Sequence, residues 1–92
     1  MNRYAKGRSF EYQVRDYYRS KGYLVTRAAK SAFPDLICLK GEEVLLIECK
    51  VVKALLTEEE KIRFKLWLNK TTAKGILAYK EKKEMKLEDI SP

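Results

Sequence analysis

Apolar residues in the middle of the chain follow the spacing of two β-strands. The segments DLICLK (residues 35–40) and EVLLIECKVV (residues 43–52) are rich in Leu, Ile and Val, and Gly41 and Glu42 between them are typical of a turn. The second segment is apolar at nearly every position, which is typical of a strand covered on both faces. We therefore predict a β-hairpin whose second strand lies at the centre of a sheet.

The N-terminal region, residues 2–21, has the pattern of an amphipathic helix. One arc of a helical projection carries Phe10, Val14, Tyr17 and Tyr18. A basic stripe beside it carries Arg8, Arg15 and Arg19. Gly22 is placed to end the helix as its C′ residue. Glu11 lies between the two stripes, so its carboxylate is expected to reach a site at the protein surface.

A second helix is predicted from Thr57 to about residue 70. Thr57 and Glu60 form the sequence of a capping box. The apolar residues of this helix fall into two groups, Ile62 with Leu66, and Phe64 with Trp67 and Leu68. Either both groups are buried, or one faces the sheet and the other a partner subunit, with Phe64, Trp67 and Leu68 as one candidate surface and the terminal strands as another.

Three further strands complete the pattern: residues 23–27, 75–80 and 85–90, with the charged turn EKKE joining the last two. At 92 residues the chain is expected to form one domain spanning residues 1–92. The apolar runs are far below the roughly 20 residues that cross a bilayer. The first ten residues lack the apolar region of a signal peptide. We expect a cytoplasmic α/β protein.

Composition indicates a basic protein and excludes catalytic sites that depend on histidine. The chain has 20 basic and 13 acidic residues and a net charge of +7, which favours a polyanionic partner such as nucleic acid, although a lysine-rich surface also suits a heat-adapted protein. Histidine is absent, which excludes Ser-His-Asp and Cys-His nucleophiles. Cys38 and Cys49 lie in predicted strands without zinc-site spacing, so we expect them to act as small buried residues.

Charged residues at the ends of the hairpin are the candidates for chemistry. Glu48 and Lys50 are two positions apart on a strand and project from the same face. An antiparallel neighbour opening at Asp35 brings a second carboxylate to the same end. Two converging carboxylates favour a hard divalent cation such as Mg²⁺, and an adjacent lysine can assist hydrolysis of a phosphodiester. The simpler alternative is an ordinary ion pair between Glu48 and Lys50.

The whole pattern resembles a known family. Pro34-Asp35, twelve intervening residues and then Glu-Cys-Lys resemble the PD-(D/E)XK nuclease superfamily, and within it the archaeal-type Holliday junction resolvases. Further matches are Lys6-Gly7 and Glu11 in KGRSFE, an arginine that ends a strand after KGY (Arg27), and a loop serine (Ser31). The resemblance covers about residues 6–53. It implies a restriction-endonuclease-like core with a mixed, mainly antiparallel sheet flanked by α-helices.

The same resemblance implies roles for individual residues. Asp35 and Glu48 would bind Mg²⁺, for which Mn²⁺ could substitute, together with the carbonyl of Cys49. Glu11 would support the metal, Lys50 would act on the nucleophilic water, and Ser31 would act near the scissile phosphate. The residues expected to bind DNA phosphates are Arg3, Lys6, Arg8, Arg15, Arg27, Lys30 and Lys53.

We therefore predict a Mg²⁺-dependent homodimer that resolves four-way DNA junctions by paired symmetric nicks. Two alternatives remain open. The first keeps the chemistry but cuts flaps or DNA in general, as a virus-type replication-repair nuclease would. The second is a basic DNA-binding module without catalysis, in which the acidic residues are structural.

Overall fold

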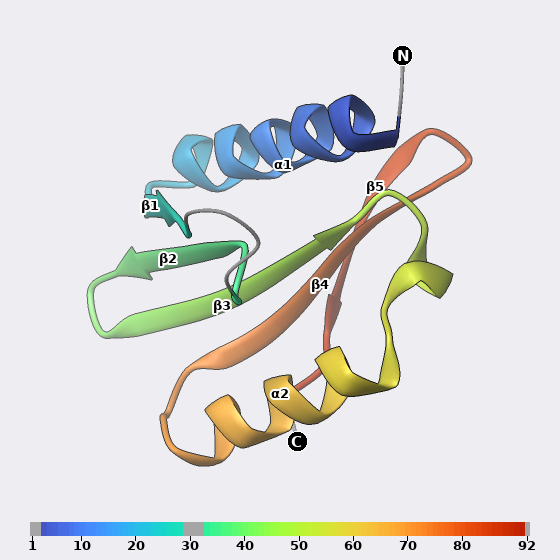
Figure 1. The fold of residues 1–92 in the computed structure, drawn as a ribbon. Coiled ribbons are helices and arrows are strands. Elements are labelled where there is room, and N and C mark those ends of the chain that lie inside the picture. The colour runs from blue at the N-terminus through green and yellow to red at the C-terminus, as the bar shows by residue number, and fades with distance from the viewer. Residues whose placement is uncertain (1–2, 29–32, 92) are drawn as a thin grey trace.

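The computed structural model describes residues 3–28 and 33–91, with side chains from residue 7 onward. A five-stranded sheet lies between two helices, α1 (Arg3–Ser20) and α2 (Glu58–Asn69), one on each face (Figure 1). The strands are β1 (Leu24–Arg27), β2 (Leu36–Lys40), β3 (Glu43–Lys50), β4 (Lys74–Glu81) and β5 (Glu84–Asp89), and a short 3₁₀ helix, η1 (Lys53–Leu55), follows β3. The α/β fold expected from the sequence is confirmed.

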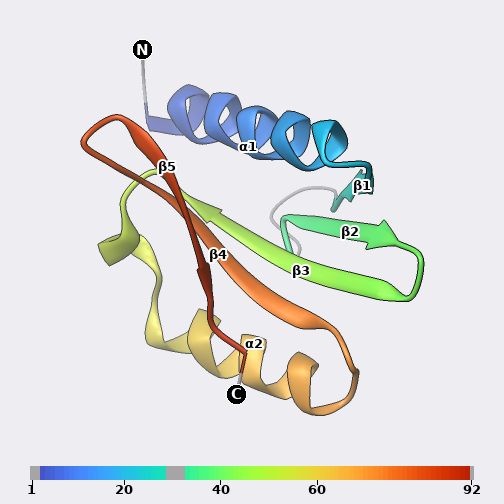
Figure 2. The same ribbon diagram turned by 180° about the vertical axis from the view of Figure 1, so that it is seen from behind.

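The sheet has the strand order β1-β2-β3-β4-β5, so β3 is central as predicted. Only the β3–β4 pair is parallel within the described sheet, and the other three pairs are antiparallel. The parallel pair requires a crossover, which η1 and α2 supply on one face of the sheet (Figure 2). β3 ends at Lys50, two residues before the predicted end, because the chain then turns into η1.

Helix α1 packs on the sheet through the predicted arc, with one exception. Phe10, Val14 and Tyr18 are buried against residues of β2, β3 and β4. Tyr17 is 38% exposed, so its assignment to the buried face was wrong. Residues 10, 14 and 18 recur every four positions, and Tyr17 is rotated by about 100° from Tyr18, toward solvent. Gly22 ends the helix region with a φ of +92°, as its predicted C′ role requires.

Helix α2 packs on the other face through Phe64 and Leu68. Together with Trp67 they were predicted as one candidate partner surface. That prediction was wrong for Phe64 and Leu68, which are in the core, whereas Trp67 is 41% exposed and its ring contacts Phe33. Gly75 of β4 explains the fit: a Cβ built at this position would lie 2.8 Å from Leu68 Cδ1, so glycine permits the helix to approach the strand. Ile62 and Leu66 instead point outward and are 57% and 56% exposed.

Local signals in the sequence account for the ends of the remaining elements. Thr57 caps α2 in a complete capping box with Glu60. The EKKE turn joins β4 to β5 with Lys82 and Lys83 at positive φ. Neither helix in the described part of the chain is long and apolar enough to cross a membrane.

Candidate active site

The hairpin β2–β3 brings Asp35 and Glu48 together. The register pairs Leu36 with Ile47, so the residue before β2 lies opposite Glu48. The two acids then hydrogen-bond to each other's strands: Asp35 Oδ2 accepts from the Cys49 N–H at 2.8 Å, and Glu48 Oε1 accepts from the Asp35 N–H at 3.2 Å. Each carboxylate is therefore fixed by the main chain of the other strand, and both lie at one end of the hairpin.

The face of the sheet from which Glu48 and Lys50 project follows from the alternation of side chains along β3. Leu45, Ile47 and Cys49 pack with the core under α1, whereas Leu46 packs with the core under α2. Glu48 and Lys50 share the parity of Leu46 and so face α2. Thus the predicted common face of Glu48 and Lys50 is the α2 face.

Glu48 has an unusual electrostatic environment. The residue is 5% exposed, and burial, followed by the neighbouring Asp35 carboxylate, raises its pKa above the ordinary value of 4.5. Lys50 on the same face opposes this increase in pKa. A buried carboxyl group beside a second carboxylate is a position where a bound cation would relieve the cost of ionisation.

The donor set fits a hard divalent cation. Asp35 and Glu48 offer carboxylate oxygens, and the Cys49 main chain lies beside Asp35. Mg²⁺ is commonly bound through one or two carboxylates while it keeps several waters. Within residues 3–28 and 33–91, no group of three or more Asp, Glu, Cys or His side chains is arranged to hold a metal. Burial raises the pKa of the Cys49 thiol, so its thiol stays protonated and is a poor metal ligand.

Lys50 is held by a residue whose role at this site the sequence analysis missed. Its Nζ donates to Glu60 Oε2 at 2.6 Å, and the two side chains are 22% and 20% exposed. Burial alone would raise the pKa of Glu60, but hydrogen bonds from Lys50 and from the Thr57 N–H outweigh it and lower the pKa to about 2. The capping box identified Glu60 as a helix-start residue, but no sequence pattern indicated that its second oxygen reaches Lys50.

Glu11 lies on the other side of the sheet from these residues. It projects from α1 and accepts a hydrogen bond from Arg27 Nε at 2.5 Å. It also contributes to the raised pKa of the Cys49 thiol, so it is close to the same end of β3. The structure therefore pairs Glu11 with Arg27 rather than with Asp35 and Glu48. Its predicted role in supporting a metal remains a prediction.

Two arginines predicted to bind DNA gather around Tyr12. The guanidinium groups of Arg15 and Arg27 lie 4.6 and 4.7 Å from the centre of the Tyr12 ring. Arg15 also pairs with Asp16 at 2.9 Å. Arg27 is next to the hairpin, because it pairs with Leu36 in the register of β1 and β2. This arginine cluster (Arg15 and Arg27) is thus adjacent to the strand that Asp35 opens.

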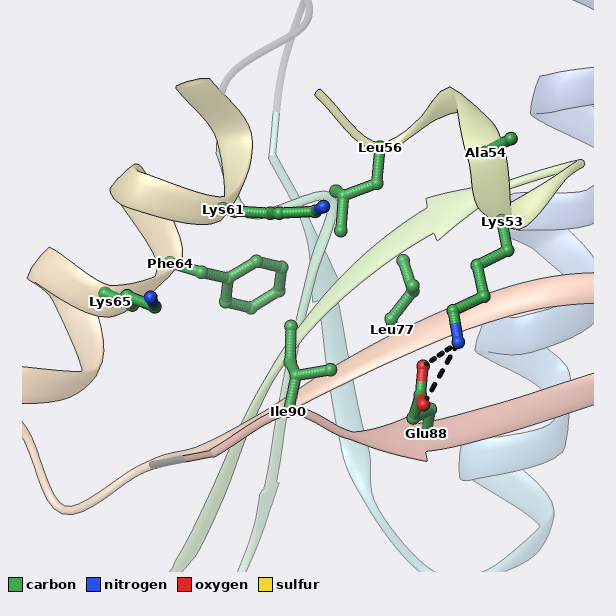
Figure 3. A pocket seen from close by; sticks show the side chains of 9 residues that line it. All are labelled: Lys53, Ala54, Leu56, Lys61, Phe64, Lys65, Leu77, Glu88 and Ile90. Carbon is green, nitrogen blue, oxygen red and sulfur yellow. Dashed lines mark hydrogen bonds and ion pairs between the residues drawn. The ribbon is translucent and has the colours of Figure 1, made fainter. Parts of the chain in front are cut away.

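The other predicted site residues are more dispersed. Arg8 is exposed on α1. Lys53 of η1 pairs with Glu88 of β5 at 3.0 Å, at the edge of a cavity of about 440 Å³ between η1, α2 and strands β4 and β5 (Figure 3). Arg3 and Lys6 lie in α1, but their side chains are outside the described part, as are Lys30 and Ser31 entirely.

The burial of Glu48 predicts a pH-dependent stability in metal-free protein. Its pKa is higher in the folded than in the unfolded chain, so the folded state retains the proton, and the free energy of unfolding falls as the pH rises above about 4.5. We expect Glu48→Gln to be more stable than wild type at pH 8 by roughly 1–3 kcal/mol, and by less at pH 5.5. The Gln side-chain oxygen can still accept the Asp35 N–H.

Urea unfolding with a chelator present, at the two pH values, measures this difference. Glu42→Gln in the exposed β2–β3 turn is the control, and it should follow the wild-type pH dependence. If wild type and Glu48→Gln show the same change in stability between pH 5.5 and 8, Glu48 does not carry the buried proton.

Comparisons with known proteins agree with this fold. A family model described as archaeal Holliday junction resolvase (Hjc) matches residues 2–91. The protein named crossover junction endodeoxyribonuclease Hjc from Methanocaldococcus jannaschii is 30% identical over 80 residues, which cover 87% of this chain and 53% of that protein. The chain thus spans about half the length of the curated relative it matches.

A solved structure has the same fold. Archaeoglobus fulgidus Hjc, described as a Holliday junction resolvase from an archaeal hyperthermophile, superposes with a TM-score of 0.78 at 24% sequence identity, covering 91% of this chain and 72% of that one. The two layers of helix around a five-stranded sheet are therefore common to both folds. The resemblance predicted from the hairpin is confirmed by the family match over nearly the whole chain. This chain belongs to the archaeal Holliday junction resolvase family.

Proposed function

We propose that this protein is a Mg²⁺-dependent endonuclease that resolves four-way DNA junctions by paired symmetric nicks, acting as one nuclease domain in the cytoplasm of an archaeal cell or an archaeal virus host. One observation carries the chemistry: Asp35 and Glu48 are each fixed by the main chain of the other's strand, with Lys50 on the same face as Glu48. The family and the name of the M. jannaschii relative support the substrate.

The residues of the site fit hydrolysis of a phosphodiester. Bound Mg²⁺, which Mn²⁺ should replace, would supply a Lewis acid for the scissile phosphate and lower the pKa of the attacking water. Asp35 and Glu48 would hold the cation, with the Cys49 carbonyl as the third protein ligand. The water oxygen bonds to phosphorus and releases a proton to solvent as the bond to the leaving ester oxygen breaks, and the leaving oxygen takes up a proton from solvent. Lys50 orients the water and stabilises negative charge on the phosphate in the transition state.

DNA binding is assigned to basic residues of α1, of β1 and the loop that follows it, and of η1. The arginine cluster flanks Tyr12 beside β2, and Arg8 lies closer to the N-terminus of α1. Such contacts neutralise phosphates and position the duplex without reading its sequence. The full proposed set also includes Arg3, Lys6, Lys30 and Lys53. Ser31 is assigned to the scissile phosphate, and Glu11 to support of the metal through the end of β3.

A junction resolvase that makes paired nicks needs two active sites, and one chain carries one. We place the interface of a homodimer on the outward face of α2, around Ile62 and Leu66. These two apolar residues are one helical turn apart, and both are more than half exposed. A second copy of the chain would bury this stripe by two-fold symmetry, which matches the approximate two-fold symmetry of a four-way junction.

Replacing Ile62 and Leu66 together by Asp is expected to convert the dimer into a monomer of 10.8 kDa, because two charges would be buried in the interface. Sedimentation equilibrium measures the mass directly. The control is Leu24→Asp on β1, which changes an apolar residue that is even more exposed and should leave the dimer intact. If the double variant remains a dimer, the interface lies elsewhere, and the edge strand β5 is the next candidate.

Cleavage of a panel of DNA substrates tests the proposed function. Four-way junctions, flaps, single strands and linear duplex should be compared at equal Mg²⁺ concentration. We expect cutting of the four-way junction at symmetric positions and little of the others. Equal cutting of all substrates would indicate the flap or general endonuclease, and binding without cutting would indicate a non-catalytic DNA-binding module.

A further inference from the structure

Glu60 connects the first turn of α2 to the active-site lysine. Its two carboxylate oxygens have separate partners: Oε1 accepts the Thr57 N–H at 2.9 Å, and Oε2 accepts Lys50 Nζ at 2.6 Å. The Glu60 N–H in turn donates to Thr57 Oγ1 at 3.1 Å. The first turn of the helix therefore fixes the carboxylate, and the carboxylate fixes the lysine.

This arrangement determines where the ammonium group of Lys50 is held. A lysine has four flexible methylene groups and loses considerable rotamer entropy when it is ordered. A hydrogen bond between two ionised groups is strong enough to favour one position, particularly where both side chains are mostly shielded from water. The other acid that interacts with Lys50 is Glu48, whose raised pKa the lysine opposes. Glu60 also lies within hydrogen-bonding reach of Glu48 and helps to raise the pKa of that carboxyl group, so it holds Lys50 beside the carboxylates assigned to the metal.

We propose that Glu60 is a positioning residue for the cleavage reaction, which holds Lys50 in the orientation needed at the scissile phosphate. The inference rests on the proposed nuclease function. It concerns a residue in the helix start rather than in the hairpin. It assigns to the capping-box glutamate a role beyond helix stability.

Three variants separate positioning from helix stability. Glu60→Ala removes both hydrogen bonds of the carboxylate. Thr57→Ala weakens the cap but leaves Glu60 able to bind Lys50, because the Thr57 donor is a main-chain N–H that alanine retains. Glu59→Gln removes a charge from the same helical turn, at an exposed side chain. All three should be tested for thermal unfolding, junction affinity and single-turnover cleavage at saturating protein.

The expected results differ between the variants. Glu60→Ala should cut the junction about 10- to 100-fold more slowly with its affinity for the junction unchanged. Thr57→Ala should lower Tm by about 4–8 °C and keep the wild-type cleavage rate. Glu59→Gln should resemble wild type in all three measurements. Glu60→Gln, which has a single side-chain oxygen for two donors, should fold and cut at an intermediate rate even if Glu60→Ala folds poorly.

A second measurement does not depend on cleavage. In metal-free, ¹⁵N-lysine-labelled protein, a lysine ammonium held in a hydrogen bond exchanges slowly and gives a resolved ¹H–¹⁵N signal. The Lys50 signal is assigned by its loss in Lys50→Met. It should remain in Thr57→Ala and Glu59→Gln and disappear or shift strongly in Glu60→Ala.

The proposal is overturned if Glu60→Ala cuts as fast as wild type or faster, since the pair would then be irrelevant or inhibitory. It is also overturned if Glu60→Ala and Thr57→Ala slow cleavage in proportion to their losses in Tm. If wild type cuts no junction, the proposed function fails instead, and the NMR signal alone decides whether Glu60 holds Lys50.

Discussion

Asp35→Asn is expected to reduce cleavage of a four-way junction by about 10³-fold or more, while junction affinity changes only a few-fold. The asparagine has nearly the same shape, and its side-chain oxygen can still accept the Cys49 N–H that Asp35 binds at 2.8 Å. It lacks the negative charge that attracts a divalent cation. The loss is therefore in the chemical step, and single-turnover cleavage with Mg²⁺ measures it.

The fold of this variant should be intact. Removing the Asp35 charge also removes one cause of the raised pKa of Glu48, so metal-free Asp35→Asn is expected to be at least as stable as wild type. Glu42→Gln is the matched control, since it removes a carboxylate from the exposed end of the same hairpin. If Asp35→Asn cleaves at the wild-type rate, the hairpin does not form the active site. If the variant loses junction binding, Asp35 contributes to DNA recognition instead.

Lys50→Met should produce the second largest effect, a loss of about 10²- to 10³-fold in the single-turnover rate. Methionine retains most of the length and apolar character of the lysine side chain but has no donor for the phosphate, the water or Glu60. Because Lys50 is only 22% exposed, its contribution to the attraction of distant phosphates is small compared with its contribution at the reacting centre. We therefore expect the rate at saturation to fall and the dissociation constant to stay nearly constant.

Lys53→Met is the matched control for Lys50→Met. Both substitutions remove one positive charge within a span of four residues, but Lys53 is exposed and paired with Glu88. We expect Lys53→Met to weaken junction binding slightly, to reduce the salt dependence of binding and to leave the saturated rate unchanged. If the two variants lose the same amount of activity, Lys50 contributes through general charge rather than at the scissile phosphate.

Much of the fold could be predicted because the decisive signals are local. The apolar run of β3 identified the central strand, the Gly41-Glu42 turn set the hairpin, and Thr57 with Glu60 marked the start of α2. The hairpin in turn places Asp35 opposite Glu48, because a short turn fixes the register of the two antiparallel strands. The core of the candidate site was therefore predictable from one segment of sequence.

What the sequence could not provide depends on how separate elements pack. The two apolar groups of α2 look equivalent in a helical projection, and the absence of a side chain at Gly75 decides that Phe64 and Leu68 face the sheet. Glu60 reaches Lys50 only because η1 sets the position of the first turn of α2 over the end of β3. Similarly, the pairing of Glu11 with Arg27 follows from the packing of α1 across β1.

We infer that two copies of this site make paired cuts in a four-way junction. The most direct measurement uses a supercoiled plasmid that extrudes a cruciform, with Mg²⁺ and wild-type protein. Paired nicks across the junction within one encounter linearise the plasmid, and we predict linear product from the earliest times and none with Asp35→Asn. Accumulation of nicked circles before any linear product, or equal cutting of a plasmid without the cruciform, would contradict paired cutting at a junction.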